Sequence, residues 1–475
     1  MEKTSLAMSA PVQTQATPHT DGEPRARTTG KAKRIATGLL VYALVTALTL
    51  FVVDRGLIAM NLFTPRYNYG HPTVGWVSAR ATGRMVEASC PNLATGQTVV
   101  FTRNEDGIRT AHSAQELRQN SGAFKIAVGG DSHTDLCEPN DKVHFGVMER
   151  ELHSLALPSA VFAFGAGKYS PLQAYLAVRE PMERYSADAF VLNLYTGNDF
   201  YDMLRVDDRP YFEADGNGYR IADPVWYQLD APNKKRDSRV LFLMESAYQK
   251  TGLRRVLLRV HYLRDVASSQ KAGVLAVGAY MNDLRKAASD SVEYPHAFSA
   301  QMLNQQLFFH RFPGSREESV RRVKALLELV RQQNPNRLLV MSPVPSYQLV
   351  DRSPVDPAFL DVIGKLPISY ESGVAEELEL YQTLKRMALE SGWVFVDNLP
   401  RLREYQGTER LYNRTDYHIE PVASQIIGKA QAHAIANACA ARAAGTPRSA
   451  LTDRPDSSVT ACDKPLAQRL PARPR

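Results

Sequence analysis

A serine that directly follows a short apolar run is the first residue of this sequence that could do chemistry. The run is Lys125–Val128, and Gly129 and Gly130 separate it from Asp131 and Ser132. Short apolar runs that stop at glycines are typical of buried strands that end in a sharp turn. If a helix starts after Ser132, the Ser132 N–H is an unpaired donor beside the hydroxyl group. Ser132 would then supply a nucleophile and an oxyanion donor, or Asp131 or Ser132 would only cap a helix.

Asp416 and His418 have the types and spacing needed to activate such a serine. They lie two residues apart, so in an extended chain their side chains point to the same side. A histidine can remove the proton from the attacking serine, and a carboxylate can orient that histidine. Taken singly, the pair could equally be metal ligands or a helix cap.

Two further stretches could stabilise the oxyanion that forms when a serine attacks an ester. Phe162–Gln173 contains Gly167, and glycines let backbone N–H groups approach a ligand closely. Asn198 follows another apolar run and could present its side-chain amide beside Ser132. Such donors act on the charge that develops in the transition state.

The elements that would position these residues alternate between strands and helices. Amphipathic helical patterns occur at Glu317–Asn334, Ala375–Ser391 and Val422–Ala438. This alternation predicts an α/β fold, a three-layer α/β/α sandwich with a mostly parallel five-stranded sheet and its site at the carboxyl ends of the strands. The five apolar runs expected as strands are Lys125–Val128, Ala160–Phe164, Ala189–Leu194, Arg337–Met341 and Trp393–Val396.

The connection after the third expected strand is far longer than an ordinary strand-to-helix loop. We expect an insertion at about 200–313 with its own structure, including helices at Leu253–Val266 and Gly273–Ser289. It could cap the site, where aromatic rings would stack on a sugar, or those rings could only pack the insertion. The aromatic residues in question are Tyr211, Trp226 and Tyr227.

One apolar stretch near the N-terminus is long enough to cross a membrane. Ile35–Val53 contains no charged residue and would form a helix about 28 Å long. Basic residues precede it, which predicts a cytoplasmic N-terminus, a single span and a periplasmic or other extracytoplasmic body. A cleaved signal peptide is the alternative, but the sequence lacks a good small-x-small site after Val53.

Charge and cysteine content restrict the class of protein further. The 475 residues have a formal net charge of +7, which the two terminal tails carry, so no nucleic-acid-binding face is expected on the body. The four cysteines have no spacing suited to zinc, and we expect neither a metal nor another cofactor. Three disulfide pairings are open, and proximity in sequence favours Cys439 with Cys462.

The combined motifs resemble the SGNH hydrolase superfamily, also called GDSL hydrolases. The resemblance rests on Gly130-Asp-Ser-His, the glycine stretch 162–173, Gly197-Asn-Asp and Arg414-Thr-Asp-Tyr-His, in this order along the chain. It implies a flavodoxin-like fold with Ser132, Asp416 and His418 as the catalytic triad. It also implies an oxyanion hole made of the Ser132 N–H, Gly167 and Asn198.

The sequence departs from the common pattern of that superfamily in two places. The last block is often Asp-x-x-His, but here only Tyr417 separates Asp416 from His418, as in bacterial members that act on cell-surface polysaccharide. In the second block, Ala163 and Lys168 occupy the places of an expected Asn and Gly. Pro72-Thr-Val-Gly-Trp resembles the lead-in of the membrane-anchored group.

These observations predict the following organisation and function. The protein would be an inner-membrane serine esterase or O-acyltransferase that removes or transfers acyl groups, notably acetyl, on an extracytoplasmic polysaccharide. Its partners would be the acylated glycan, the membrane and, for transfer, a membrane protein that donates the acyl group. A lipase, esterase or thioesterase acting on small or lipid esters and a silent glycan-binding scaffold are the alternatives. The expected segments are a disordered tail at 1–34, a span at 35–53, a lead-in with a β-hairpin at 54–120, an SGNH-like domain at 121–438 and a disordered tail at 439–475.

Overall fold

The computed structural model places α1 in one compact unit and the sheet-containing body in another, and each is described separately. The structure describes residues 29–59, 69–71, 73–77, 81–91, 98–119, 122–206, 209–216, 218–223, 240, 304–351, 368–413 and 417–443.

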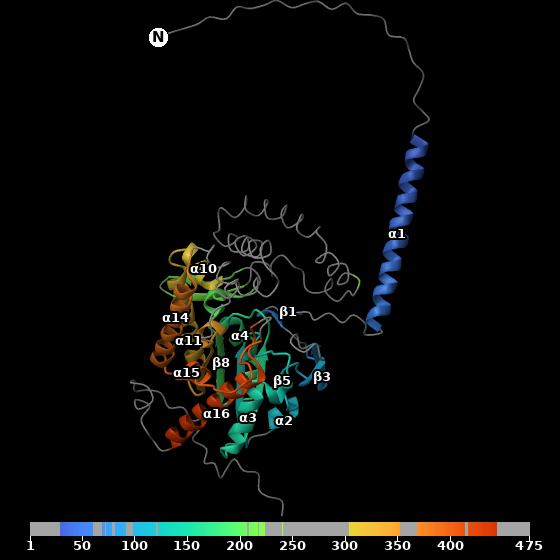
Figure 1. Ribbon diagram of the computed structural model, residues 1–475. Helices are drawn as coiled ribbons and strands as arrows, with labels where there is room; N and C mark the ends of the chain where they lie inside the picture. Colours follow the sequence, from blue (N-terminus) through green and yellow to red (C-terminus); the bar gives the residue numbers. More distant parts are fainter. Residues whose placement is uncertain are drawn as a thin grey trace, which may run out of the picture. The chain divides into compact units, whose positions relative to one another are not determined.

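Helix α1, Thr29–Ala59, contains the apolar stretch (Figure 1). Its segment Arg34–Leu57 has 24 residues and a mean hydropathy of 2.2, and it is not buried by the rest of the chain. The expected span 35–53 lies inside it. By length and composition, α1 can therefore cross a membrane or serve as a signal sequence.

The body is built on a mixed sheet with a parallel half. Strand β6 (Phe124–Gly130) lies between β7 (Ser159–Gly165) and β8 (Ala189–Tyr195), followed outward by β11 (Leu338–Val344) and β12 (Val394–Phe395). All these neighbours pair in parallel. Each of the five expected strands is thus present, and the chain order across this half is that of a doubly wound α/β sheet, whose ligands bind at the carboxyl ends of the strands.

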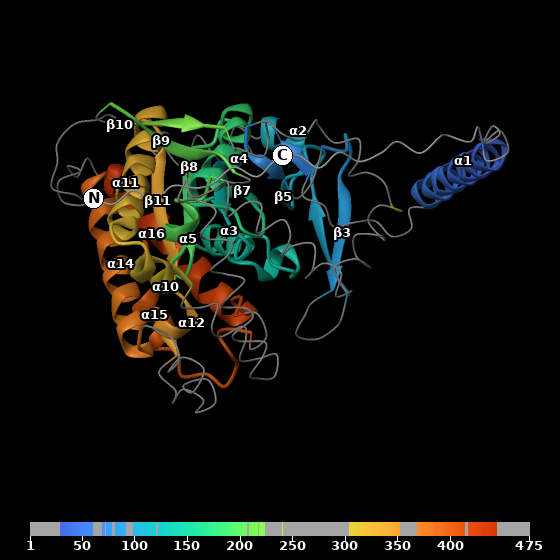
Figure 2. The same ribbon diagram turned by 90° about the horizontal axis from the view of Figure 1, so that it is seen from above.

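The expected number of five strands is too low, because the sheet has eight strands within the described residues. The added strands come from the lead-in: β3 (Val86–Pro91), β4 (Thr98–Arg103) and β5 (Arg109–Thr110). Strand β5 pairs antiparallel with β7, and β4 and β3 follow in antiparallel pairs. Figure 2 shows β3 at the opposite end of the sheet from β11. The lead-in therefore covers an edge that β7 would otherwise expose.

Side chains of the parallel strands alternate between two apolar clusters, as the pleat requires. Phe190 and Leu192 of β8 belong to the cluster that contains residues of α4 (Pro171–Arg184) and α11 (Ser315–Gln333). Val191 belongs to the cluster that contains residues of α3 (His144–Ser154) and α16 (Pro421–Ala443). Helices α3 and α16 lie side by side in Figure 1 and contact each other. Helix α14 (Tyr370–Glu390) contributes to both clusters.

Short elements connect this framework. Hairpin β9–β10 begins the long insertion, and Tyr211 starts β9, whereas Trp226, Tyr227 and the helices expected at 253–266 and 273–289 lie outside the described residues. The remaining elements are β1 (Tyr69–His71), β2 (Gly75–Val77), α2 (Ala114–Gln119), η1 (Asn140–Lys142), α5 (Asp199–Asp202), β9 (Tyr211–Asp215), β10 (Gly218–Ala222), α10 (Asn304–Arg311), α12 (Tyr347–Val350) and α15 (Asn398–Arg403).

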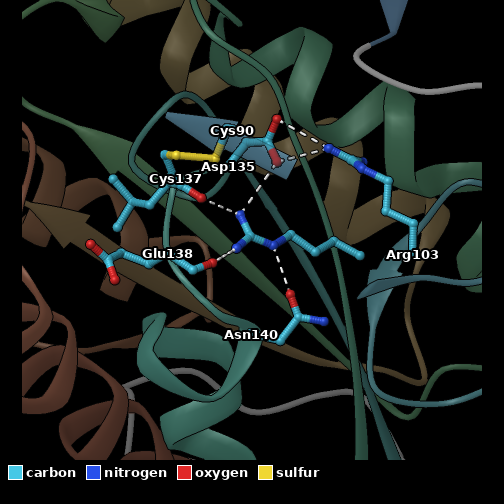
Figure 3. The surroundings of a disulfide bond; sticks show 8 residues. Cys90, Arg103, Asp135, Cys137, Glu138 and Asn140 are labelled. Atoms are coloured by element: carbon cyan, nitrogen blue, oxygen red, sulfur yellow. Dashed lines mark hydrogen bonds and ion pairs between the residues drawn. A yellow bond between two sulfur atoms is a disulfide. The ribbon is translucent and has the colours of Figure 1, made fainter. Parts of the chain in front are cut away.

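A disulfide joins Cys90 of β3 to Cys137, 47 residues later (Figure 3). The bond forms because the lead-in strands bring β3 beside the segment that follows β6. It is compatible with the bridge between Cys439 and Cys462 that the sequence favours. That second bridge remains a prediction, since Cys462 lies outside the described residues.

Candidate active site

Ser132 lies on a tight turn at the carboxyl end of β6. The N–H groups of Thr134 and Asp135 both donate to Asp131 O, at 3.1 and 3.2 Å. No α-helix starts there, because α3 begins only at His144, so the Ser132 N–H does not lie at a helix N-terminus. The single turn nevertheless leaves the Ser132 N–H without a hydrogen bond among the described residues, and the Ser132 side chain is partly exposed.

Gly130 and Gly165 allow this turn to pack closely against the neighbouring strands. A Cβ atom on Gly130 would lie 2.1 Å from Thr134 Oγ1, and one on Gly165 would lie 2.8 Å from Asp131 O. Neither distance is sterically possible without movement. Glycine is therefore required at the ends of both β6 and β7 for the serine turn to keep its position.

His133 links the serine turn to the loop that carries His418. Its N–H donates to Asp131 Oδ1 at 2.9 Å, closing an Asx-type turn around Ser132. Its ring stacks on Tyr195 with centroids 4.2 Å apart and lies 4.9 Å from the His418 ring. The carboxyl ends of β6 and β8 and the loop before α16 therefore meet beside Ser132.

The His418 loop is a short hairpin. Asn413 N–H donates to His418 O at 2.8 Å, and Tyr412 and Ile419 form an antiparallel bridge. Tyr417 has φ of 56°, which places it in the left-handed region that non-glycine residues adopt at a cost. The backbone at Tyr417 is therefore not extended, unlike the extended chain that was assumed from the spacing of Asp416 and His418. Asp416 itself lies outside the described residues.

Asn198 lies just past β8, at the start of α5. Its Nδ2 donates to Asp202 Oδ2 at 2.8 Å, and its side chain is partly exposed. The next residue, Asp199, is buried and accepts a hydrogen bond from Tyr195 N–H at 2.7 Å. These two contacts fix the turn after β8. They also leave one side-chain N–H of Asn198 bound to Asp202.

Gly167 lies in the loop that follows β7. It is exposed, a Cβ atom there would meet nothing within 4 Å, and no hydrogen bond among the described residues uses its N–H. The next residue, Lys168, has φ of 69°. Lys168 thus has the backbone conformation that favours glycine.

Burial shapes the electrostatics around the serine turn. Burial raises the pKa of Asp131 to about 6, while the hydrogen bond from the His133 N–H opposes that rise. Burial and the neighbouring carboxylates raise the pKa of Asp199 well above its ordinary value. Burial also holds the pKa of His133 well below its ordinary value and lowers that of His144 to about 4. At neutral pH, His133 and His144 are therefore neutral.

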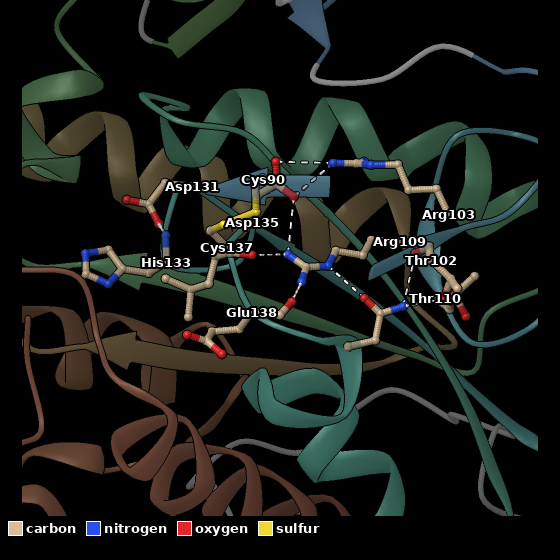
Figure 4. A network of polar contacts seen from close by, with 12 residues as sticks. Cys90, Thr102, Arg103, Arg109, Thr110, Asp131, His133, Asp135, Cys137 and Glu138 are labelled. Atoms are coloured by element: carbon tan, nitrogen blue, oxygen red, sulfur yellow. Dashed lines mark hydrogen bonds and ion pairs between the residues drawn. A yellow bond between two sulfur atoms is a disulfide. The ribbon is translucent and has the colours of Figure 1, made fainter. Parts of the chain in front are cut away.

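Arg109 organises the segment that follows the serine turn. It is almost completely buried and donates to Leu136 O at 2.5 Å, to Glu138 O and to Asn140 Oδ1 at 2.8 Å. In Figure 4 its guanidinium group points into this segment, next to Asp135 and the disulfide. Asp135 also pairs with Arg103 at 3.0 Å. The segment from 135 to 140 is thus tied to β4 and β5 by charge and to β3 by the disulfide.

A buried carboxyl group, Glu377 of α14, joins the loops after β8 and β11. The hydroxyl of Thr196 donates to Glu377 Oε1 at 2.6 Å, and the hydroxyl of Ser346 donates to Oε2 at 2.8 Å. Ser346 N–H donates to Thr196 Oγ1 at 3.2 Å. Burial raises the pKa of Glu377 to about 7 despite these donors.

A polar layer lies beneath the serine turn inside the sheet. Asn193 Nδ2 donates to Thr134 Oγ1 at 3.0 Å, and Gln431 Nε2 of α16 donates to Asn193 Oδ1 at 2.9 Å and to Ser342 Oγ at 2.8 Å. All four side chains are buried. Within the described ranges, no group of three or more His, Cys, Asp or Glu side chains could hold a metal ion.

Sequence reasoning missed several residues that support this site, namely His133, Asp202, Arg209 and Glu377. The adjacency of His133 to Ser132 was a usable signal for the first. The other three carry no local signal, because single charged residues in a helix or loop are normally solvated. Only the fold shows that they are buried.

Comparisons with known proteins gave structural likenesses only. No family model and no curated protein matches the chain. A lipase/acylhydrolase from Enterococcus faecalis is 11% identical with a TM-score of 0.31, over 66% of this chain and 96% of that one. An acetylxylan esterase from Geobacillus stearothermophilus is 12% identical with a TM-score of 0.31, over 67% and 96%. An α/β hydrolase enzyme from the metagenome of Lake Arreo is 13% identical with a TM-score of 0.29, over 66% and 94%.

Proposed function

We propose that this chain is an SGNH-type serine esterase or O-acyltransferase, anchored in the inner membrane by α1, that acts on acyl groups of an extracytoplasmic polysaccharide. The observation that carries the proposal is the contact between the rings of His133 and His418, centroids 4.9 Å apart. It joins the residue after Ser132 to a histidine almost three hundred positions later in the sequence. Ser132 would be the nucleophile and His418 the general base.

The surroundings of Ser132 suit attack on an ester. His418 would take the hydroxyl proton while the oxygen forms a bond to the ester carbonyl carbon, and Asp416 would orient His418. The sugar hydroxyl then leaves with the proton from His418, and an acyl-enzyme on Ser132 remains. Water attacking this acyl-enzyme gives hydrolysis, whereas a second sugar hydroxyl gives transfer.

Three donors would stabilise the oxyanion of the tetrahedral intermediate. The N–H groups of Ser132 and Gly167 are unused among the described residues, and Asn198 has a second amide N–H besides the one bound to Asp202. Each preorganised donor contributes a few kcal/mol to the transition state, according to measured oxyanion holes. The imidazole of His133, which burial keeps neutral, packs against His418 without adding a competing charge.

The function is tested with a fluorophosphonate probe and an acetylated glycan. The full-length protein in detergent should be labelled at Ser132, and should release acetate from the glycan or transfer it to an added acceptor sugar. Ser132→Ala, which removes only one oxygen atom, should abolish both labelling and turnover. Labelling of Ser132→Ala at the wild-type rate would refute the assignment, and turnover of lipid esters alone would favour a lipase.

Membrane topology is tested independently of activity. Basic residues before Ile35 and the apolar span predict a cytoplasmic N-terminus and an extracytoplasmic body. Protease added to spheroplasts should therefore digest the body while leaving α1 protected. Protection of residues beyond Asp54 would contradict this topology and the glycan as substrate.

A further inference from the structure

A buried ion pair lies directly beside Asn198. The side chains of Asp202 and Arg209 are 3% and 0% exposed, and Arg209 Nη1 donates to Asp202 Oδ1 at 2.9 Å. The other oxygen, Asp202 Oδ2, accepts Asn198 Nδ2 at 2.8 Å. Arg205 Nη1 also lies 3.6 Å from Asp202 Oδ1. One oxygen of this carboxylate therefore faces two arginines, and the other holds the asparagine amide.

The ion pair is a costly way to fill this space. Removing two charges from water costs several kcal/mol for each ion, and apolar residues of similar volume often give equal or greater stability. Buried ion pairs are therefore weak evidence for a stabilising role, and fixing one arrangement of polar groups is an alternative role. The polar group fixed here is the carboxamide of Asn198.

Asp202 determines which way that carboxamide faces. A carboxylate only accepts hydrogen bonds, so the nitrogen of Asn198 must point to Asp202 and its oxygen away from it. Asn198 Oδ1 is buried and has no hydrogen-bond partner among the described residues. The orientation is therefore set by Asp202 and not by a donor to that oxygen. With one N–H held, the plane of the amide and the direction of its second N–H are fixed as well.

Arg209 keeps the carboxylate from opposing catalysis. An uncompensated carboxylate next to Asn198 would repel a developing oxyanion. The buried guanidinium group of Arg209 supplies the opposite charge at 2.9 Å, and the partly exposed Arg205 adds to it at 3.6 Å. Arg209 in turn lies 5.5 Å from the ring of Trp76. Trp76 is also held by Tyr169, whose ring lies 5.6 Å away and whose hydroxyl donates to Trp76 O at 2.5 Å. The lead-in strand β2 and the loop after β7 thus both support this arginine.

We propose that Asp202 and Arg209 are positioning residues that hold the Asn198 carboxamide in the orientation required to bind the oxyanion. The inference rests on the proposed esterase function. It gives the lead-in motif a role in the site, because Trp76 packs against the buried guanidinium group that pairs with Asp202.

The test is a double-mutant cycle on full-length protein in detergent, with p-nitrophenyl acetate as substrate. Asp202→Asn keeps the shape of the side chain but can place either an oxygen or an NH2 group against Asn198. We expect kcat to fall about tenfold with KM little changed, a part of the loss that follows removal of a whole oxyanion donor. In an Asn198→Ala background the same change should lower kcat by less than about twofold, because the group it positions is gone.

Two further variants complete the cycle. Arg209→Lys keeps the positive charge but lacks the planar guanidinium group with its paired N–H donors. It should give a smaller loss of kcat, and this loss should also be absent in the Asn198→Ala background. Asp215→Asn, at an exposed position of β9, is the matched control and should keep wild-type kcat. Thermal unfolding of each variant accompanies the kinetics.

The outcomes separate this inference from the proposed function. If wild-type protein is active and labelled by fluorophosphonate, but the loss caused by Asp202→Asn is equal in both backgrounds, the positioning role is wrong and the function stands. Failure of both Asp202→Asn and Arg209→Lys to fold would equally overturn the inference, since a clamp on one amide leaves the fold intact. A wild-type protein that is neither active nor labelled overturns the function and the positioning role together.

Discussion

The imidazole rings of His133 and His418 lie with centroids 4.9 Å apart and planes inclined by 40°. The His133 ring also stacks on the ring of Tyr195, with centroids 4.2 Å apart, and the His133 N–H donates to Asp131 Oδ1. The ring that touches His418 is therefore fixed from β6 and β8. Because burial keeps His133 neutral, the contact orients the loop of His418 without repelling a protonated imidazole.

Ser132 and His418 should act as one unit. Ser132→Ala and His418→Ala should each remove nearly all esterase activity, and the double variant should be little worse than either one. Catalytic groups that work on the same proton transfer show such non-additive losses. Steady-state kinetics and circular dichroism of the three variants measure this. A double variant whose loss equals the product of the single losses would show that the two residues do not share a step.

Replacing Asn198 should reduce esterase activity less than replacing Ser132 or His418, but a charged residue at this position should be poorly tolerated. Asn198→Ala should lower kcat by about 10² to 10³ with KM little changed, as expected for one oxyanion donor. Asn198→Asp should be worse, because a second carboxylate would face Asp202 Oδ2, now 2.8 Å from the amide nitrogen, and would also repel the oxyanion. Near-wild-type turnover of Asn198→Asp on an acyl ester would eliminate the oxyanion role.

The parallel half of the sheet could be predicted from the sequence because its strands are buried on both faces. Runs such as Ala189–Leu194 are continuously apolar, and the glycines after Val128 mark the end of β6. The lead-in strands were harder, since β3 and β4 are partly exposed and mix polar with apolar residues. Their place at the sheet edge depends on pairing with β7, which no local pattern encodes.

The candidate site could be predicted only where chemistry leaves a local pattern. Ser132, Asn198 and His418 each follow a strand or precede a helix in a recognisable motif. Glu377, by contrast, is one glutamate in a helix with several others, and only the close approach of two loops makes it a buried group. The backbone between Asp416 and His418 is not extended at Tyr417, which is left-handed, a conformation that no sequence pattern predicts for tyrosine.

The disulfide should stabilise the segment after the serine turn. Breaking the bond between Cys90 and Cys137, which closes 47 residues, should lower the free energy of unfolding by about 4 kcal/mol in the chain-entropy account. Urea unfolding with and without reductant measures this for wild type and for the Cys90→Ser/Cys137→Ser variant. The variant should lack the reductant-induced loss of stability assigned to this bridge. Equal losses in wild type and variant would show that reductant acts elsewhere.

Lys168→Gly should stabilise the loop after β7. Lys168 is exposed and has φ of 69°, which costs an L-residue about 1–2 kcal/mol, whereas glycine adopts it freely but loses more chain entropy on folding. A net gain of up to about 1 kcal/mol in unfolding free energy is expected. Lys142→Gly is the control, because Lys142 is exposed in η1 without a positive φ and glycine there should destabilise. A loss of stability in both variants would contradict the backbone argument.

Glu377 should make stability depend on pH in a direction that its burial determines. Burial raises its pKa in the folded protein to about 7, above the ordinary 4.5 that applies to the unfolded chain. The folded state therefore binds this proton more tightly. The stability that it contributes is fully present below about pH 4.5 and is lost as the pH rises through about 7. Thr196 and Ser346, which donate to the carboxylate, reduce the loss without reversing it.

Glu377→Gln, which does not titrate, isolates this effect. The unfolding free energy of wild type minus that of Glu377→Gln should fall between about pH 4.5 and about pH 7, by at most about 1.4 kcal/mol per pH unit. Urea unfolding of both proteins at constant ionic strength measures the difference. Glu390→Gln, an exposed position at the end of the same helix, should run parallel to wild type. If the difference for Glu377→Gln were also constant with pH, Glu377 would be ionised throughout, and the hydroxyls of Thr196 and Ser346 would outweigh its burial.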